Sequence, residues 1–434
     1  MNIIYKILLH AETGIGDFSF LSLKALVPAF IYFSFFFPAD SAVIRVCRDC
    51  GLRSVQEGLK KAQAGDTLEV HSGTYAEGTV EIRKPLHLKG IGRPVIDGGR
   101  KGHVFDIQSD SVTVEGFKIV KGGVSDIREF AGIHTENIRD CRFINNELED
   151  NAYGFYLAKT EKCTLKGNSS VGNAKDEVSG GNGIHLWYCT DISIIENEVR
   201  AHRDGLYLEF SNHLLIEKNF STESIRYGLH FMFSSENRFY RNRFSRNSTG
   251  TAIMYSKKIE VRENSFEKSK DLNSYGILLK DISDSDFSGN VFQENTVGIN
   301  ADSASRNVFA GNQFKNNGWA VNMFGNCDDN RLVQNNFIGN VFDVSTNSRE
   351  NHNLYERNYW DQYKGFDLNS DGTGDKPFLP VRFFGYWVSL YPFLMVLFQS
   401  PVIEFLETAE RVFPVMSPAD LKDNYPVMRK YTYD

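Results

Sequence analysis

The stretch from Gly183 to Ser256 repeats one short phrase. Gly183–Trp187 reads GIHLW, Gly205–Glu209 reads GLYLE, Gly228–Met232 reads GLHFM and Ala252–Ser256 reads AIMYS. In each phrase the second and fourth residues are apolar, whereas the first, third and fifth differ in kind. This alternation is typical of a β-strand that presents two faces. Its return after about 23 residues, with no helical period between copies, indicates a solenoid of stacked coils.

A second marker repeats in step with this phrase. It is an asparagine, in most coils two positions before an apolar residue, and it stands at Asn146, Asn168, Asn197, Asn219, Asn242, Asn264, Asn290, Asn312, Asn335 and Asn358. Amides that hydrogen-bond along the stack would explain this column, and so would turns that favour asparagine. Two markers with one period predict an all-β fold, a right-handed parallel β-helix of about 22–23-residue coils.

Changes in composition suggest the boundaries of this solenoid. We expect a signal peptide over residues 1–42, the β-helix with an N-terminal cap over 43–366, a calcium-type loop over 367–380 and an apolar, partly helical tail over 381–434. A solenoid escapes the size limit of one compact domain, because each coil packs only on its neighbours. Ser54–Glu57 matches a capping box and predicts a short helix that covers the first coil.

Charge and the N-terminal segment restrict the partners. The net charge is −7 over 434 residues and no basic stripe stands out, which argues against nucleic acid. The apolar run Ala25–Phe37 is followed by small residues, which is the pattern of a cleaved export signal, with an uncleaved anchor as the alternative. Both interpretations place the rest of the chain outside the cytoplasm, and we expect it in the periplasm.

The six cysteines are too few for a disulfide framework. Four of them fall within coils and are expected to be small buried residues: Cys141, Cys163, Cys189 and Cys327. Cys47 and Cys50 form a C-x-x-C pair near the predicted export signal. A local disulfide is the simpler interpretation in an oxidising compartment, and a soft copper-binding pair is the second.

Residues 367–375, which read DLNSDGTGD, resemble the first half of a calcium loop. The oxygen donors alternate along the segment: Asp367, Asn369, Asp371, Thr373 and Asp375. The glutamate usual at the twelfth position is replaced by Phe378. A structural Ca²⁺ (or Mg²⁺) that stabilises the exit from the last coil is one interpretation, and a metal-free Asx turn is the other.

The tail from Val381 is strongly apolar, but Pro392 and Pro401 interrupt it before a span of about 20 residues can form. One interpretation is a cap on the end of the solenoid. The other is a docking element for a membrane partner, because exposed apolar surface marks interfaces. The candidate docking residues are Phe383, Phe384 and Trp387.

The third and fifth residues of each phrase are expected to face outward and to form an outer wall. In this alignment the third column includes His185, Tyr207, His230 and Met254, and the fifth column includes Trp187, Glu209, Met232 and Ser256. Adjacent coils lie about 4.8 Å apart, so His230, Met232 and Met254 are expected to meet, with His185 nearby. Imidazole and thioether form a soft ligand set that suits Cu(I).

Two other functions compete with copper binding. Trp187, Tyr207 and Glu209 also suit a protein-binding face without metal. A β-helix polysaccharide lyase or epimerase would need a base and a neutralising Arg or cation in a groove. The wall shows few Asp, Arg or Lys residues in adjacent coils, and His202–Asp204 gives only a weak hint of a carboxylate–imidazole pair.

These residues resemble the NosD family of periplasmic nitrous oxide reductase maturation proteins. The resemblance covers roughly residues 50–430. It rests on these segments: Gly183–Trp187, His202–Gly205, Arg226–Ser234, Met254–Ser256, Asn317–Ala320, Asp328–Asn330, Asn336–Asn340, Asn358–Trp360 and Ser400–Pro401. Single coils of this kind are common among β-helix proteins, whereas the combined series is much more specific.

The resemblance implies an adaptor that is not itself an enzyme. Its expected partners are an ABC-type ATPase and permease, a copper-delivering lipoprotein, and the apo form of nitrous oxide reductase, whose copper–sulfide site would be supplied. The tail would dock on the permease. The resemblance assigns no role to Cys47 and Cys50.

Overall fold

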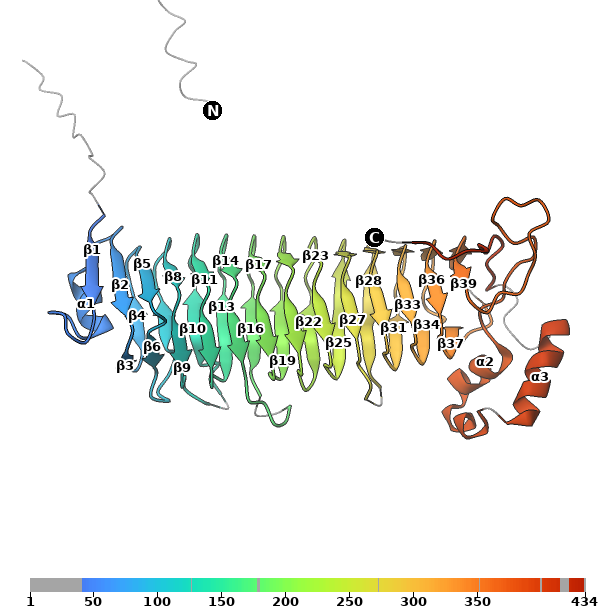
Figure 1. Cartoon of the computed structure of the whole chain (residues 1–434), viewed down its shortest axis with the longest axis horizontal. Helices are drawn as coiled ribbons and strands as arrows, with labels where there is room; N and C mark the ends of the chain where they lie inside the picture. Colours follow the sequence, from blue (N-terminus) through green and yellow to red (C-terminus); the bar gives the residue numbers. More distant parts are fainter. Residues whose placement is uncertain are drawn as a thin grey trace, which may run out of the picture. The chain divides into compact units, whose positions relative to one another are not determined.

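The computed structural model describes residues 41–432, apart from 126, 178–179, 272, 351, 399 and 414–420. The segment 1–40, which carries nearly all of the predicted signal peptide, lies outside the described residues. The described part from Ser41 onward is a parallel β-helix whose coils follow one another from β1 to β39 (Figure 1). The fold class expected from the repeat is confirmed.

Three parallel sheets of 14, 12 and 13 strands form the described coils. Sheet A contains β1 (Val43–Val46), β2 (Thr67–His71), β5 (His87–Ile91), β8 (Thr113–Glu115), β11 (Arg142–Ile144), β14 (Thr164–Lys166), β17 (Ser193–Ile195), β20 (Leu215–Glu217), β23 (Arg238–Tyr240), β26 (Glu260–Arg262), β29 (Asp286–Ser288), β32 (Val308–Ala310), β35 (Arg331–Val333) and β38 (Leu354–Glu356). Sheet B contains β3 (Thr74–Ala76), β6 (Val95–Asp97), β9 (Lys118–Val120), β12 (Glu147–Glu149), β15 (Ser169–Val171), β18 (Glu198–Arg200), β21 (Phe220–Thr222), β24 (Arg243–Ser245), β27 (Ser265–Glu267), β30 (Val291–Gln293), β33 (Gln313–Lys315), β36 (Asn336–Ile338) and β39 (Tyr359–Trp360).

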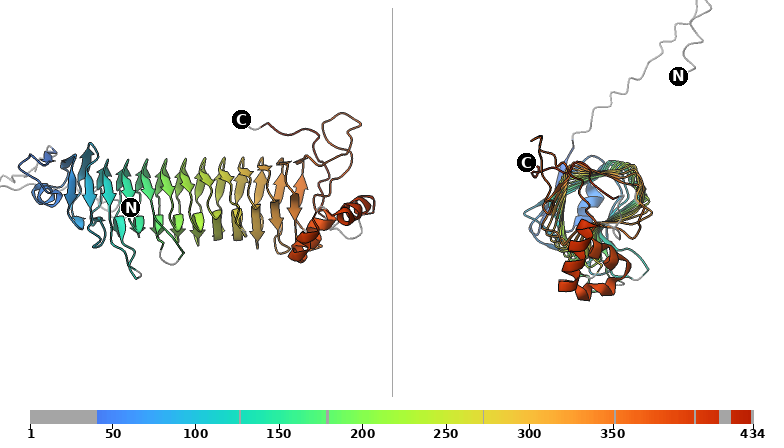
Figure 2. Two further views of the ribbon diagram at one scale, coloured as in Figure 1. Left: turned by 60° about the horizontal axis from the view of Figure 1, so that its bottom comes forward. Right: turned by 90° about the vertical axis from the view of Figure 1, so that its right-hand side faces the viewer.

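Sheet C carries the repeated phrase. It contains β4 (Val80–Ile82), β7 (Phe105–Ile107), β10 (Ala131–Glu136), β13 (Tyr153–Ala158), β16 (Asn182–Trp187), β19 (Asp204–Glu209), β22 (Tyr227–Met232), β25 (Thr249–Lys257), β28 (Tyr275–Ser283), β31 (Val297–Asp302), β34 (Trp319–Met323) and β37 (Phe342–Ser345). Viewed end on, the coils of the solenoid superpose around one interior (Figure 2). The apolar second and fourth residues of the phrase fill that interior, as Leu229 and Phe231 do from β22.

The asparagine column is a hydrogen-bonded ladder. From Asn146 to Asn335, each side-chain Nδ2 donates to Oδ1 of the next asparagine over 2.9–3.1 Å. The last member, Asn358, donates instead to the buried carboxylate of Asp423, 3.1 Å away. The ladder was one of two explanations for this column, and the structure supports it. The C-terminal segment therefore closes the ladder.

Helices cover both ends of the solenoid. Helix α1 (Val55–Lys61) begins after Ser54, whose Oγ accepts from the Glu57 N–H, and it buries Val55 and Leu59 on the first coil. The tail forms α2 (Phe383–Leu390), the 3-10 helix η2 (Pro392–Leu397) and α3 (Pro401–Val412) beyond the last coil (Figure 1). None of the helices in the described part of the chain is both long enough and apolar enough to cross a membrane.

Candidate functional site

A ladder of imidazole and phenol rings runs along the outer face of sheet C and begins at His103, just before β7. It consists of His103, His134, Tyr156, His185, Tyr207 and His230, with ring centroids between 3.9 and 5.8 Å apart. We call this set the His–Tyr ladder. Tyr207 separates His185 from His230 and contacts each at 4.7 Å. The two imidazoles are therefore two coils apart and do not face each other.

The His–Tyr ladder is largely withdrawn from water. His185 is 9% exposed and His230 is 7% exposed, so neither imidazole faces bulk solvent. Burial, helped by the charge of Arg203, lowers the pKa of His185 to about 3. Burial also raises the pKa of Tyr207 to about 12. His185 and Tyr207 are therefore neutral at physiological pH.

A buried carboxylate lies beside His230. Asp204 is fully buried at the start of β19 and accepts from Arg226 Nε over 2.9 Å, while Arg203 Nε lies 3.4 Å away. Burial opposes its ionisation, but the neighbouring His230 and the Arg226 guanidinium outweigh that effect and keep the pKa of Asp204 below its usual value. Asp204 therefore remains an anion between two arginines.

These neighbours determine where each imidazole carries its proton. Arg226 Nη2 lies 3.3 Å from His230 Nδ1, and a guanidinium can only donate, so Nδ1 accepts and the proton is on Nε2. Arg203 donates to Asn182 Oδ1 over 3.2 Å, which turns the Asn182 amide nitrogen toward His185 Nδ1, 3.3 Å away. Both Nε2 atoms are therefore protonated in this arrangement.

The two imidazoles differ in their capacity to change tautomer. His230 Nδ1 lies 3.9 Å from Asp204 Oδ2, so a small movement would let the carboxylate accept a hydrogen bond from Nδ1–H of the other tautomer, in which Nε2 is unprotonated and free for a metal. His185 faces the amide of Asn182 at Nδ1, and its Nε2 has no hydrogen-bond partner among the described residues. The geometry favours His230 over His185 as a metal ligand.

Two methionines pair directly on the same wall. Met232 on β22 is the register partner of Met254 on β25, and both are half-buried. This corrects the sequence alignment, in which Met254 shared a column with His230. The register partner of His230 is Ala252, and Met254 belongs to the column of Trp187, Glu209 and Met232. Ser256, which the alignment placed there, is buried.

Glycine contacts explain this register. The strand position that starts each phrase is held by Gly228, Gly250 and Gly276 in consecutive coils, and a Cβ at any of them would lie within 2.6 Å of the next carbonyl oxygen. Gly250, and not Ala252, therefore opens the phrase in its coil. The regular glycine column was the signal that the sequence alignment missed.

The charged neighbours of the His–Tyr ladder were also missed. The wall was expected to carry few Asp, Arg or Lys residues, yet Arg203, Asp204 and Arg226 gather there. The suggested pairing of His202 with a carboxylate is wrong, because His202 is buried and its Nε2 lies 2.9 Å from Ser170 Oγ. The same repeat position holds Arg203 and Arg226 in consecutive coils, and this spacing was visible in the sequence.

Several other candidate residues lie away from this wall. Cys47 and Cys50 form a disulfide, so their sulfurs are not thiolate ligands for copper in this structure. The remaining cysteines are buried, as expected. Within the described residues, no three His, Cys, Asp or Glu side chains are grouped to hold a metal ion.

The loop 367–375 is internally hydrogen-bonded. Asp367 accepts from the backbone N–H groups of Asp371 and Gly372 over 3.2 and 2.8 Å, and Asp371 accepts from Thr373 N–H over 2.7 Å. Asp375 accepts from the backbone N–H of Leu368, and Asn369 donates to Asp371. This bonding is what an Asx turn requires, and calcium binding there stays a prediction.

The tail divides into a buried part and an exposed part. Phe384 and Val388 of α2 pack on Phe342 of the last coils, so Phe384 is part of the cap and is not available to a partner. Phe383 and Trp387 are half-buried. The strongly exposed apolar residues lie further on, in η2 and α3: Phe393, Val396, Val402 and Phe405.

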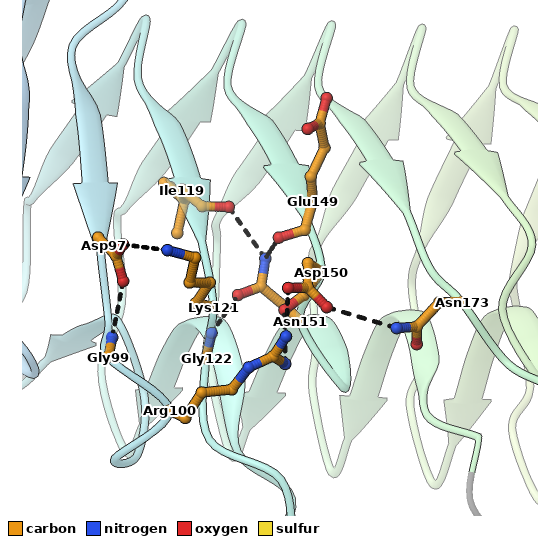
Figure 3. Close-up of polar contacts among 10 residues, drawn as sticks. All are labelled: Asp97, Gly99, Arg100, Ile119, Lys121, Gly122, Glu149, Asp150, Asn151 and Asn173. Carbon is orange, nitrogen blue, oxygen red and sulfur yellow. Dashed lines mark hydrogen bonds and ion pairs between the residues drawn. The ribbon is translucent and has the colours of Figure 1, made fainter.

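A separate polar cluster lies where sheet B leads into sheet C (Figure 3). Arg100 forms an ion pair with Asp150, and Asn173 donates to the same carboxylate over 3.4 Å. Buried Asn151 donates to the Ile119 carbonyl and accepts from the Gly122 N–H. These groups satisfy one another, and the cluster has the character of a structural brace.

Comparison with known proteins identifies relatives over most of the chain. A family model described as "Periplasmic copper-binding protein (NosD)" matches residues 175–365. A "Probable ABC transporter binding protein NosD" of Pseudomonas aeruginosa is 32% identical over 393 residues, which is 86% of this chain and 91% of that protein. The protein of the same description from Stutzerimonas stutzeri is 30% identical, covering 82% and 86%.

Two solved structures are similar to this chain at low identity. The A-module of mannuronan C-5 epimerase AlgE6 from Azotobacter vinelandii is 13% identical with a TM-score of 0.49, covering 71% of this chain and 89% of that one. The surface adhesin PfbA of Streptococcus pneumoniae is 11% identical with a TM-score of 0.48, covering 74% and 92%. Identity above 30% across nine-tenths of a curated relative decides the family, and the chain belongs to the NosD family of periplasmic copper-binding proteins.

Proposed function

We propose that this protein is a periplasmic accessory factor for maturation of the copper–sulfide site of nitrous oxide reductase. It acts as the adaptor of an ABC-type ATPase and permease and binds copper transiently. The observation that carries this proposal is the direct pairing of Met232 with Met254 on an outward-facing wall, in a chain of a copper-binding family. Its further partners are a copper-delivering lipoprotein and the apo-reductase.

The donor set suits Cu(I) as cargo. Two thioethers on adjacent coils are about 4.8 Å apart at the backbone, and His230 lies on the same strand face two residues before Met232. Sulfur and imidazole are soft ligands, which favour Cu(I) over calcium or magnesium. Asp204 would support His230 by accepting a hydrogen bond from Nδ1–H when Nε2 binds the metal.

Weak and changeable ligation fits a transfer role. The hydrogen bond from Arg226 to His230 Nδ1 has to break before the imidazole can bind copper. Arg203 and Arg226 outnumber the one carboxylate beside them, Asp204, and the remaining positive charge also opposes the approach of a cation. Both effects lower the affinity of the site, which helps an accessory protein to release its cargo to a client.

The tail is the proposed contact with the permease. Val396 is 89% exposed and Phe405 is 72% exposed, although both are apolar. Exposed apolar residues of this size usually mark an interaction surface. The relatives described as ABC transporter binding proteins support an association of this kind.

Anaerobic titration tests the copper site. Cu(I) is divided between the exported chain and the chelator bathocuproine disulfonate, for the wild type and for Met232→Leu/Met254→Leu. Leucine keeps the volume and removes both sulfurs. We expect the affinity to fall at least about tenfold, or 1.4 kcal/mol. Met428→Leu, at a thioether outside the wall, is the matched control, and unchanged affinity in the double variant would refute the site.

A carbohydrate-active enzyme is the second candidate. The observation that favours it is the set of Arg203, Arg226, His230 and Tyr207 beside one another on sheet C. However, Arg226 is already neutralised by Asp204, so it is not free to neutralise a substrate carboxylate. Incubation with polymannuronate, followed by NMR for unsaturated or epimerised residues, separates the two functions. We expect no conversion.

A further inference from the structure

Four aromatic rings form a continuous stack at the corner where sheet C leads into sheet A. They belong to Tyr188, Phe210, Phe233 and Tyr255, which occupy the same position in consecutive coils. Their centroids lie 4.7, 5.1 and 5.0 Å apart, and neighbouring rings are within 16° of parallel. We call these four residues the corner stack.

The fold does not require rings at this corner. The four residues have φ between 49° and 53°, a left-handed conformation that L-residues adopt at a cost. In the coils before and after, the same left-handed position holds Lys159 and Asp281. A charged residue therefore satisfies the backbone equally well, and the rings need another explanation.

The rings also remain in contact with water. Tyr188 is 50% exposed, Phe233 is 42% exposed and Tyr255 is 41% exposed. Surface aromatics that stack over four coils form a contiguous apolar strip, and such strips mark binding surfaces. Other left-handed corner positions in the described coils carry mainly polar or charged residues, which shows how local this strip is.

The corner stack adjoins the proposed copper ligands. Phe233 and Tyr255 follow Met232 and Met254 directly in the chain, and Tyr188 follows Trp187, whose ring it contacts edge-on at 4.8 Å. Lys159 lies over the Trp187 ring at one end, and Lys280 is the register partner of Met254 at the other. The strip is therefore apolar along its length, with the positive charge of Lys159 at one end and the oppositely charged neighbours Lys280 and Asp281 at the other.

We infer that the corner stack is the docking surface for a protein that presents Cu(I) to Met232 and Met254. This inference rests on the proposed function of those methionines. The partner would have an apolar patch with an acidic residue at the border that meets Lys159, since charge complementarity guides docking. A strip four coils long suits a small, short-lived interface, which is what a donor that must leave again requires.

A transfer experiment with two copper sources tests this inference. Phe210→Lys/Phe233→Lys introduces at the corner the residue type that Lys159 already supplies. Cu(I) is offered either as the bathocuproine disulfonate complex or on the soluble domain of the copper-delivering lipoprotein. We expect the variant to keep its copper affinity against the chelator, and to accept copper from the protein donor at least about tenfold more slowly.

Controls separate the possible failures. Ser303→Lys adds the same charge at the same corner two coils beyond Tyr255, and Phe233→Tyr keeps the ring; both should transfer at the wild-type rate. Circular dichroism and thermal unfolding show whether the double variant folds. An unchanged transfer rate from the protein donor overturns the docking inference. A change in the self-association of the variant, measured by sedimentation, also overturns it, because the strip would then contact a second copy of this chain. If the wild type binds no copper, the proposed function is wrong. Binding of the donor protein without copper then still tests the corner stack, so the two failures can be told apart.

Discussion

Met254 lies directly opposite Met232 on the next coil, and the two residues are paired in the parallel register of β22 and β25. A soft-metal surface on this wall depends on this pairing, because it brings the two thioethers side by side. The phrase alignment by sequence would instead place Ser256 opposite Met232. The two registers differ by two residues, and a covalent cross-link distinguishes them.

We predict that Met232→Cys/Met254→Cys forms a disulfide on mild oxidation. Paired Cα atoms of adjacent parallel strands are about 4.8 Å apart, which lies within the range of disulfides. Met232→Cys/Ser256→Cys is the matched control, because a diagonal pair is about 8 Å apart and cannot be bridged. Mass spectrometry of the digested protein identifies the linked peptides. Linking of the control pair in preference to the first would show that the register is wrong.

We predict that His230→Gln weakens Cu(I) binding and His185→Gln does not. Asp204 can accept a hydrogen bond from Nδ1–H of His230 and so stabilise the tautomer with a free Nε2, whereas the amide of Asn182 keeps the proton of His185 on Nε2. The measurement is competition with a Cu(I) chelator, with the unfolding midpoint as a check on folding. Equal losses in both variants would contradict the tautomer argument.

The asparagine ladder makes a prediction about stability. Asn219 is buried and bonds to Asn197 and Asn242 on both sides, so Asn219→Ala leaves buried donors and acceptors unpaired in two coils. We expect a loss of about 3 kcal/mol in the free energy of unfolding. Asn347→Ala, at an exposed turn, should cost much less. Urea unfolding measures both, and similar losses would mean that the ladder adds no stability of its own.

The solenoid could be predicted from the sequence because particular residue types recur once in every coil. Asparagine and glycine recur where a buried amide or a Cβ-free position is needed in every coil, as at Asn219 and Gly228. The arrangement of the candidate copper site was harder to predict from the sequence. Starting the phrase at Ala252 and not at Gly250 displaced Met254 by two residues in the alignment. Side chains alternate between the two faces of a strand with a period of two, so a two-residue error keeps the pattern of apolar and polar residues intact.

The charge state of the residues at the site could be inferred only from the folded structure. Asp204 is ionised and buried only because Arg203 and Arg226 flank it on neighbouring turns, and such a balance depends on distances of a few ångströms. Likewise, Phe384 looks like any exposed apolar residue of the tail until Phe342 of the last coil is seen against it. The sequence shows that charged and aromatic residues are present, but it does not show which of their side chains are buried by neighbours in the fold.

Asp343 predicts a pH dependence of stability. It is buried on β37, and burial together with the charge of Asp361 raises its pKa to about 7. A carboxyl whose pKa is higher in the folded state binds more protons when folded. Its contribution is therefore fully present at low pH and declines as the pH rises from its ordinary pKa of 3.8 to about 7.

We therefore expect wild-type protein to lose more stability than Asp343→Asn between about pH 5 and about pH 8. Asparagine stays neutral and keeps a group that can bond to the side chain of Asn340, as Asp343 does over 3.3 Å. Asp281→Asn, at an exposed corner, should follow the wild type. Urea midpoints at the two pH values give the comparison. A parallel decline in all three proteins would mean that Asp343 is ionised at no cost.

The exposed apolar residues of η2 and α3 are the proposed contact with the permease. We expect Val396→Glu/Phe405→Glu to reduce co-purification with the permease at least about tenfold, because each change places a charge where apolar surface would be buried. Point variants are preferable to removing residues 383–434, since Asp423 accepts bonds from Asn358 and Trp360 and its loss would damage the last coil. Leu368→Glu, at an 80% exposed apolar residue outside the tail, is the control. Normal co-purification of the double variant, with the control also unchanged, would exclude η2 and α3 as the contact and leave the half-buried Trp387 side of α2 as the surface to test next.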